Sequence, residues 1–131
     1  MIALDTNVIV RVITRDDEAQ ARRGAALMRE NDLWLSKTVL LETEWVLRFT
    51  YEYDAANVGL ALSKLLGLQN LTVEEPHAVE RALAWHREGM DFADALHLAS
   101  SGSAERFATF DRRMAKSVAR APGAIPVELL K

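Results

Sequence analysis

Short runs of apolar residues alternate along the chain with longer stretches of helical periodicity. The short runs lack strict polar and apolar alternation, which is typical of strands that are covered on both faces. Helical spacers between such strands favour a mainly parallel sheet flanked by helices, an α/β architecture. We therefore predict one five-stranded sheet, with strands at residues 2–4, 33–35, 71–73, 107–109 and 125–127.

The helical stretches are bounded by residues that commonly begin helices. Pro76 stands at a first-turn position, and Asp54, Asp91 and Asp111 stand where N-caps are expected. Neither an internal repeat nor a Gly/Ser-rich linker divides the 131 residues, so we predict a single domain over residues 1–131. The predicted helices cover residues 8–14, 17–30, 38–53, 55–66, 77–88, 93–103 and 112–120.

The composition excludes several kinds of chemistry. The chain has no cysteine, which rules out disulfides, a thiolate nucleophile and cysteine-ligated metal sites, and which fits a cytoplasmic protein. No apolar run is long enough to span a membrane, and the first residues do not resemble a secretory signal. The formal charge of −3, from 19 acidic and 16 basic residues, offers no global attraction to nucleic acid. A polyanionic partner would have to be held locally, by clustered bases or bound cations.

Asp5 directly follows the first predicted strand and precedes the apolar segment 8–10. This is the rim of an open α/β sheet, where ligands bind at the carboxyl ends of the strands. Asp5 is also suited to cap the next helix, because aspartate favours such corners. Both roles remain open from the sequence.

Glu42 interrupts an apolar stripe that Val39, Val46 and Phe49 form on the helix predicted over residues 38–53. An ionised carboxylate on such a face is costly unless a cation or hydrogen bonds compensate it. Glu44 and Arg48, by contrast, have the i,i+4 spacing of a solvated surface pair. We therefore expect Glu42, rather than Glu44, to be the functional acid.

Further acids stand at the starts of two later helices. Asp91 and Asp94 enter the apolar helix of residues 93–103, with Asp91 as its natural cap and Asp94 in the first turn. Asp111 repeats the position of Asp5, since it follows a strand and precedes a helix. Capping explains each of these residues, yet a second acid, Asp94, so close to Asp91 is more than capping of one helix requires.

A parallel sheet would bring Asp5, Glu42, Asp94 and Asp111 to one rim. Two unit charges about 4 Å apart repel by roughly 4 kcal/mol at an effective dielectric of 20, so the cluster needs a divalent cation or shifted pKa values. Oxygen ligands alone favour Mg²⁺ or Mn²⁺ over zinc. Such ions, held by carboxylates with open positions, suit phosphodiester hydrolysis.

The chain resembles the PIN-domain family, and within it the VapC-like ribonuclease toxins of type II toxin–antitoxin pairs. The resemblance implies an α/β domain with a central parallel sheet, Mg²⁺-dependent endoribonuclease activity, homodimers and inhibition by a small cognate antitoxin. Four blocks carry it in order along almost the whole chain: Leu4-Asp5-Thr6-Asn7, Glu42, residues 91–99 (DFADALHLA) and Thr109-Phe110-Asp111.

The resemblance also assigns roles to residues. Asp5 and Asp94 match the principal metal ligands, and Glu42 and Asp111 match the remaining acids of the site. Asp91 matches a position at which the family tolerates an acid, and we expect it to act as the helix cap. Polar neighbours that orient the carboxylates or the attacking water are expected at Thr6, Asn7 and Thr109.

Basic residues near these acids are candidates for RNA binding. Arg112, Lys116 and Arg120 form one stripe on the last helix, beside Arg113, although a solvated face is an equal explanation for Arg120. Arg11 and Arg15 lie one turn apart on the helix after Asp5 and are further candidates, while Arg22 and Arg23 are expected simply at the surface. His97 is expected to be structural. The aromatic residues Phe49, Tyr51 and Tyr53 are candidates for a dimer or antitoxin interface.

These features favour a metal-dependent endoribonuclease toxin over two alternatives. A phospho-acceptor receiver domain needs an acidic pair after its first strand, and here Asp5-Thr6-Asn7 provides one acid. A catalytically silent RNA-binding or interaction module would keep the basic stripe but would not need Glu42 on an apolar face. The RNA target and the number of metal ions are not encoded in a readable pattern.

Overall fold

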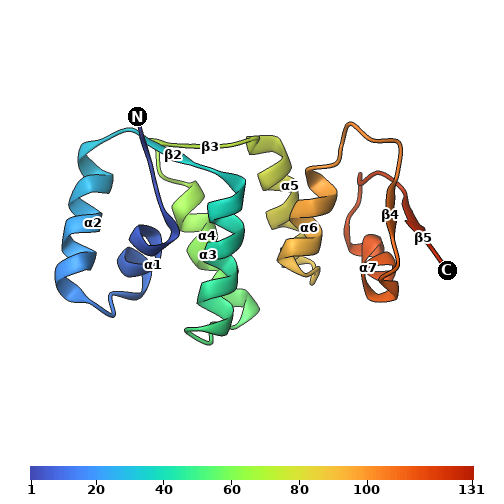
Figure 1. The fold of residues 1–131 in the computed structure, drawn as a ribbon, viewed down its shortest axis with the longest axis horizontal. Helices are drawn as coiled ribbons and strands as arrows, with labels where there is room; N and C mark the ends of the chain where they lie inside the picture. Colours follow the sequence, from blue (N-terminus) through green and yellow to red (C-terminus); the bar gives the residue numbers. More distant parts are fainter. The chain divides into compact units, whose positions relative to one another are not determined.

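The computed structural model describes residues 1–131, which form two compact units, Met1–Glu74 and Glu75–Lys131. The first unit contains β1 (Ile2–Ala3), α1 (Thr6–Thr14), α2 (Glu18–Glu30), β2 (Leu33–Leu35), α3 (Lys37–Phe49), α4 (Ala55–Leu66) and β3 (Leu71–Val73) (Figure 1). The second contains α5 (Pro76–Arg87), α6 (Phe92–Ala99), β4 (Phe107–Thr109), α7 (Arg112–Ser117), a 3₁₀ turn (Val118–Arg120) and β5 (Val127–Leu129).

The strands of each unit pair in parallel. In the first unit β2 lies between β1 and β3, and its Leu33 and Leu35 are fully buried. In the second unit β4 pairs with β5. The α/β class with parallel strands is thus confirmed, but the prediction of one five-stranded sheet is wrong, because the strands form a three-stranded and a two-stranded sheet. Strands of two or three residues give the sequence little signal of which strands pair.

Local chemistry explains where the predicted boundaries shift. The last strand begins at Val127 rather than residue 125, since Pro126 has no N–H to donate to a ladder, although its carbonyl accepts from Phe107 at 2.8 Å. Helix α6 ends at Ala99 rather than residue 103, where the hydroxyl of Ser101 donates to the carbonyl of His97 at 2.8 Å and competes with the helical pattern.

Aspartate caps begin most of the helices. The side chains of Asp54 and Asp91 each accept a hydrogen bond from the backbone N–H three residues ahead, and Asp111 accepts from the N–H groups two and three residues ahead. Pro76 occupies the first turn of α5. These predictions are confirmed. Asp5 also caps α1, which therefore begins at Thr6, two residues before the predicted start.

Helix α3 buries a different face from the one predicted. Its buried positions are Leu40, Thr43, Glu44 and Leu47, so the stripe that includes Glu42 is rotated away by about 100°. Glu42 is exposed, and Glu44 is only 1% exposed. The expectation that Glu42 interrupts a buried apolar face, with Glu44 solvated, is therefore wrong.

The buried charge of Glu44 is compensated within the same helix. Arg48 donates to both carboxylate oxygens, from Nε at 2.8 Å and from Nη2 at 3.2 Å. The predicted i,i+4 pair thus exists, but its acid lies in the interior. Two charge-assisted hydrogen bonds offset the cost of removing this carboxylate from water.

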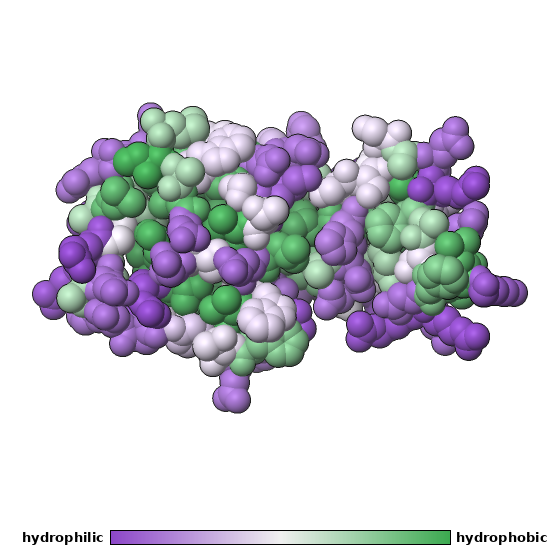
Figure 2. All heavy atoms as spheres, viewed as in Figure 1, coloured by the Kyte–Doolittle hydropathy of each residue, from purple (hydrophilic) through white to green (hydrophobic).

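The surface mixes polar and apolar groups. Hydrophilic residues gather where α1 turns into α2, as the purple region at the lower left of Figure 2 shows. No helix of the chain combines the length and the apolar character needed to cross a membrane.

We predict that Arg48→Ala lowers the free energy of unfolding by about 2 to 4 kcal/mol, because it leaves the Glu44 carboxylate buried without its partner. Adding Glu44→Gln to this variant is expected to restore about 1 kcal/mol or more, since the amide carries no charge. Arg22→Ala, which removes an exposed arginine 3.8 Å from Glu18, is the control and should change stability by less than about 0.5 kcal/mol. Urea unfolding measures all three, and a double variant no more stable than Arg48→Ala would contradict the assignment.

Candidate active site

Asp5 stands between β1 and α1, at the carboxyl end of the strand. The backbone N–H of Leu4, just before it, still pairs with the carbonyl of Trp34 in β2 at 3.0 Å. One carboxylate oxygen of Asp5 accepts from the N–H of Thr6 at 2.8 Å, and the side chain is exposed. The second oxygen makes no hydrogen bond within the chain. Asp5 therefore caps α1 and keeps an oxygen directed to solvent, so the two roles are compatible.

Thr6 connects this corner to α3. Its side chain is buried, and its hydroxyl donates to Oε1 of Glu42, 36 residues further along the chain. Glu42 is exposed beyond this bond. The buried hydroxyl of Thr6, the residue directly after Asp5, thus fixes one carboxylate oxygen of Glu42. The first unit therefore brings together Asp5, Thr6 and Glu42 from elements distant in sequence.

The second unit places Asp94 among other acids. Its pKa is raised, first by partial burial of its carboxyl group and then by the negative charges of Asp91 and Asp111. The positive charges of Arg113 and His97 act in the opposite direction. Half-buried Asp94 thus lies in a local excess of negative charge that a cation would relieve.

Asp91 and Asp111 each cap the N-terminus of a helix. Asp91 accepts from the N–H of Asp94 at 3.1 Å at the start of α6. One oxygen of Asp111 accepts from Arg113 at 2.9 Å and from Met114 at 3.2 Å at the start of α7. The N–H of Asp111 in turn donates to the hydroxyl of Thr109 at 3.0 Å, which fixes the turn after β4. Thr109 therefore positions the backbone that carries Asp111.

The basic residues fall into two groups. Arg112, Lys116 and Arg120 are exposed on α7 and the 3₁₀ turn. Arg11 and Arg15 instead pair with acids in the first unit: Arg11 with Asp16 at 3.0 Å, and Arg15 with Glu18. His97 is exposed on α6 and thus is not packed in the core, as a structural histidine was expected to be.

The four candidate acids fall two in each unit, Asp5 and Glu42 in the first and Asp94 and Asp111 in the second. No three His, Asp or Glu side chains converge closely enough to form a metal site. The donor chemistry nevertheless fits a hard divalent cation, because every candidate ligand is a carboxylate. The raised pKa of Asp94 and the free oxygen of Asp5 agree with such a ligand set.

Comparison with known families decides the classification. The model of the PIN domain matches residues 2–120, which is nearly the whole chain. The chain belongs to the PIN-domain family. None of the curated proteins compared with the chain matches it. PIN domains are in general metal-dependent nucleases that act on RNA, so membership supports a hydrolase of this broad class.

Sequence patterns missed two features of the first unit. One is the buried Glu44 and Arg48 pair, which a helix register shifted by one residue would have disclosed. The other is the polar network in which Tyr51 donates to Asp16 at 2.5 Å and Arg11 contacts both. Tyr51 was expected at an interface, and no sequence signal links it to a loop 35 residues away.

We predict that Asp91→Ala lowers the free energy of unfolding by about 1 kcal/mol, because the N–H of Asp94 loses its capping acceptor. Asp91→Asn keeps an equally good acceptor and should change stability by less than about 0.5 kcal/mol. The same variant should lower the pKa of Asp94, since it removes a neighbouring negative charge. Chemical unfolding and NMR titration measure these effects; equal destabilisation by both substitutions would contradict the capping role.

Proposed function

We propose that this chain is a metal-dependent endoribonuclease in which the four acids hold Mg²⁺, or Mn²⁺ in its place. The observation that carries the proposal is the bond from Thr6 to Glu42, which brings an acid of α3 beside Asp5. A hydroxyl that orients a carboxylate in this way is typical of the residues surrounding a metal site. Family membership supports the same class of activity.

In this proposal Asp5, Glu42, Asp94 and Asp111 would hold the cation, and all four lie within the residues 2–120 that match the family. When bound, Mg²⁺ supplies activation of water, orientation of the phosphate and stabilisation of charge on the leaving oxygen.

Each neighbouring residue then has a defined task. Thr6 holds the Glu42 carboxylate in a fixed orientation, and Thr109 holds the backbone of Asp111. Asn7, exposed in the first turn of α1, offers an amide to the substrate or to a water molecule. Arg112 and Lys116, exposed on the helix that Asp111 caps, attract RNA phosphates.

We further propose that the nuclease is the toxin of a type II toxin–antitoxin pair, cytoplasmic, homodimeric and inhibited by a small antitoxin. Two surfaces of the first unit support protein partners. On α3, Trp45 is 53% exposed and Phe49 is 55% exposed, with ring centroids 5.1 Å apart. An apolar pocket of about 560 Å³ includes Ile13, Leu60 and Leu68 in its lining. Aromatic and apolar groups of this kind are enriched in the cores of protein interfaces.

We predict that the purified protein cleaves RNA with Mg²⁺ and loses this activity in EDTA. Asp5→Asn and Asp94→Asn should each lower the cleavage rate by at least about 100-fold, because an amide is a poor ligand for the cation. Asp54→Asn is the matched control, since Asp54 only caps α4 and asparagine caps equally well. Gel analysis of labelled RNA measures the rates; cleavage that survives both EDTA and Asp5→Asn would overturn the proposal.

We also predict that expression of the chain without its antitoxin arrests bacterial growth, and that Asp94→Asn abolishes the arrest. Growth curves with an inducible promoter measure the effect, with Asp54→Asn as the control that should remain toxic. Unimpaired growth at a verified protein level would contradict the toxin role, while leaving the nuclease activity to be judged by cleavage in vitro.

A further inference from the structure

The first unit has a groove between α1 and α2 that no role assigned so far explains. Its volume is about 550 Å³. Asn7 and Arg11 contribute to its lining from α1, and Gln20, Arg23 and Gly24 from α2. Val8 and Leu27 complete the lining. Four of the seven lining residues thus carry amide or guanidinium donors, which suit phosphate and sugar oxygens.

Gly24 lines the groove at a point where α1 and α2 pack closely. A Cβ atom at this position would lie 3.0 Å from Cγ2 of Val12 on the neighbouring helix, so the two helices approach more closely than an alanine would permit without adjustment. Glycine also adds no side chain to the groove. Its presence inside α2 costs helix stability of about 1 kcal/mol relative to alanine, and close packing of α1 against α2 offsets this cost.

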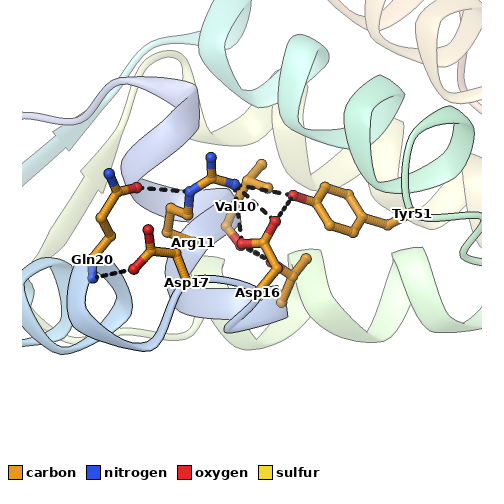
Figure 3. Close-up of polar contacts among 7 residues, drawn as sticks. Val10, Arg11, Asp16, Asp17, Gln20 and Tyr51 are labelled. Atoms are coloured by element: carbon orange, nitrogen blue, oxygen red, sulfur yellow. Dashed lines mark hydrogen bonds and ion pairs between the residues drawn. The ribbon is translucent and has the colours of Figure 1, made fainter.

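Arg11 is held rigidly in the groove wall. Its Nε donates to Gln20 at 2.8 Å, and its Nη1 contacts both carboxylate oxygens of Asp16 at 3.0 Å and the hydroxyl of Tyr51 at 3.1 Å (Figure 3). Nη2 makes none of these bonds. The guanidinium group is thus fixed in orientation before any ligand arrives, and one of its nitrogen atoms remains available as a donor.

Arg23 supplies the unbalanced positive charge. Asp16 neutralises Arg11, whereas Arg23 is exposed and forms no ion pair in the structure. Arg22, the next residue on α2, does not line the groove, and its Nε lies 3.8 Å from Glu18. Two adjacent arginines of the same helix therefore differ in both environment and charge balance.

The groove begins beside the candidate active site. Asn7 lines it and lies two residues after Asp5, in the first turn of α1. Arg11 follows Asn7 by one helical turn, so the donors of α1 are arranged along the helix away from Asp5. A chain molecule that is cleaved at Asp5 would meet these donors as it passes along the groove.

We propose that the α1–α2 groove binds the sugar-phosphate backbone of single-stranded RNA next to the cleavage site. Arg23 and Nη2 of Arg11 contact phosphates, and Asn7 contacts the nucleotide nearest Asp5. The proposal rests on the endoribonuclease function and adds the path of its substrate. Single-stranded RNA is favoured over a duplex because its flexible backbone can bring phosphates to donors on both α1 and α2.

The test compares Arg23→Ala with Arg22→Ala, which remove the same charge from adjacent positions. Binding of a fluorescein-labelled single-stranded RNA of about ten nucleotides is followed by anisotropy in EDTA, where no metal-dependent cleavage occurs. We expect Arg23→Ala to weaken binding roughly three- to tenfold and to reduce the salt slope by about 0.7, the value for one lost phosphate contact. Arg22→Ala should do neither, and Arg23→Lys should recover part of the loss.

Equal effects of Arg23→Ala and Arg22→Ala would overturn the proposal, because general charge rather than the groove would then attract RNA. Unchanged RNA binding in Arg23→Ala would overturn it as well, and would leave the groove to a protein partner. Since binding is measured without metal, a specific effect of Arg23→Ala would support the groove even if the chain failed to cleave RNA. If the chain cleaves RNA but Arg23→Ala has no specific effect on RNA binding, the nuclease function would stand and RNA binding in the groove would be wrong.

Discussion

Asp5, Asp91 and Asp111 each accept backbone hydrogen bonds at the start of a helix, and the candidate site depends on this arrangement. Carboxylates close together repel one another, but the N–H groups and the dipole of a helix N-terminus stabilise negative charge there. Capping occupies one oxygen of Asp5 and leaves the other without a partner in the chain. At Asp5 the interaction that begins the helix therefore also leaves a carboxylate oxygen available to a ligand.

On helix α3, Glu42 and Glu44 are only two residues apart but differ in burial. Glu44 lies in the interior, where Arg48 satisfies both of its oxygens. Glu42 lies at the surface, and Thr6 fixes one of its oxygens. The buried acid is fully paired and serves stability, whereas the exposed acid retains capacity to bind a ligand. This division supports Glu42 as the functional acid for a reason different from its predicted position on an apolar face.

The alternation of strands and helices could be predicted from the sequence because apolar periodicity and aspartate caps are local signals. Helix α4 has the predicted limits, and only the last strand is shifted by two residues, at Pro126. Strand pairing and the buried face of α3 could not be predicted as well. Two- and three-residue strands carry no register information. On α3, the predicted buried face with Glu42 and the observed buried face with Glu44 differ by a rotation of only about 100°. The network of Arg11, Asp16 and Tyr51 joins segments that are distant in sequence, so local patterns do not reveal it.

The formal charge of −3 describes the whole chain and not the distribution of charge over its surface. Acids concentrate where a cation would neutralise them, and Arg23 is left unbalanced beside Asn7. The central proposal is that Asp5, Glu42, Asp94 and Asp111 serve as ligands of a divalent cation. Titration of Mn²⁺ by EPR tests it most directly with the wild type, Asp5→Asn and Asp94→Asn. We predict that each single substitution removes the same binding event, and that the double variant is no worse than either. Retention of full Mn²⁺ binding in one of the single variants would contradict the proposed ligand set.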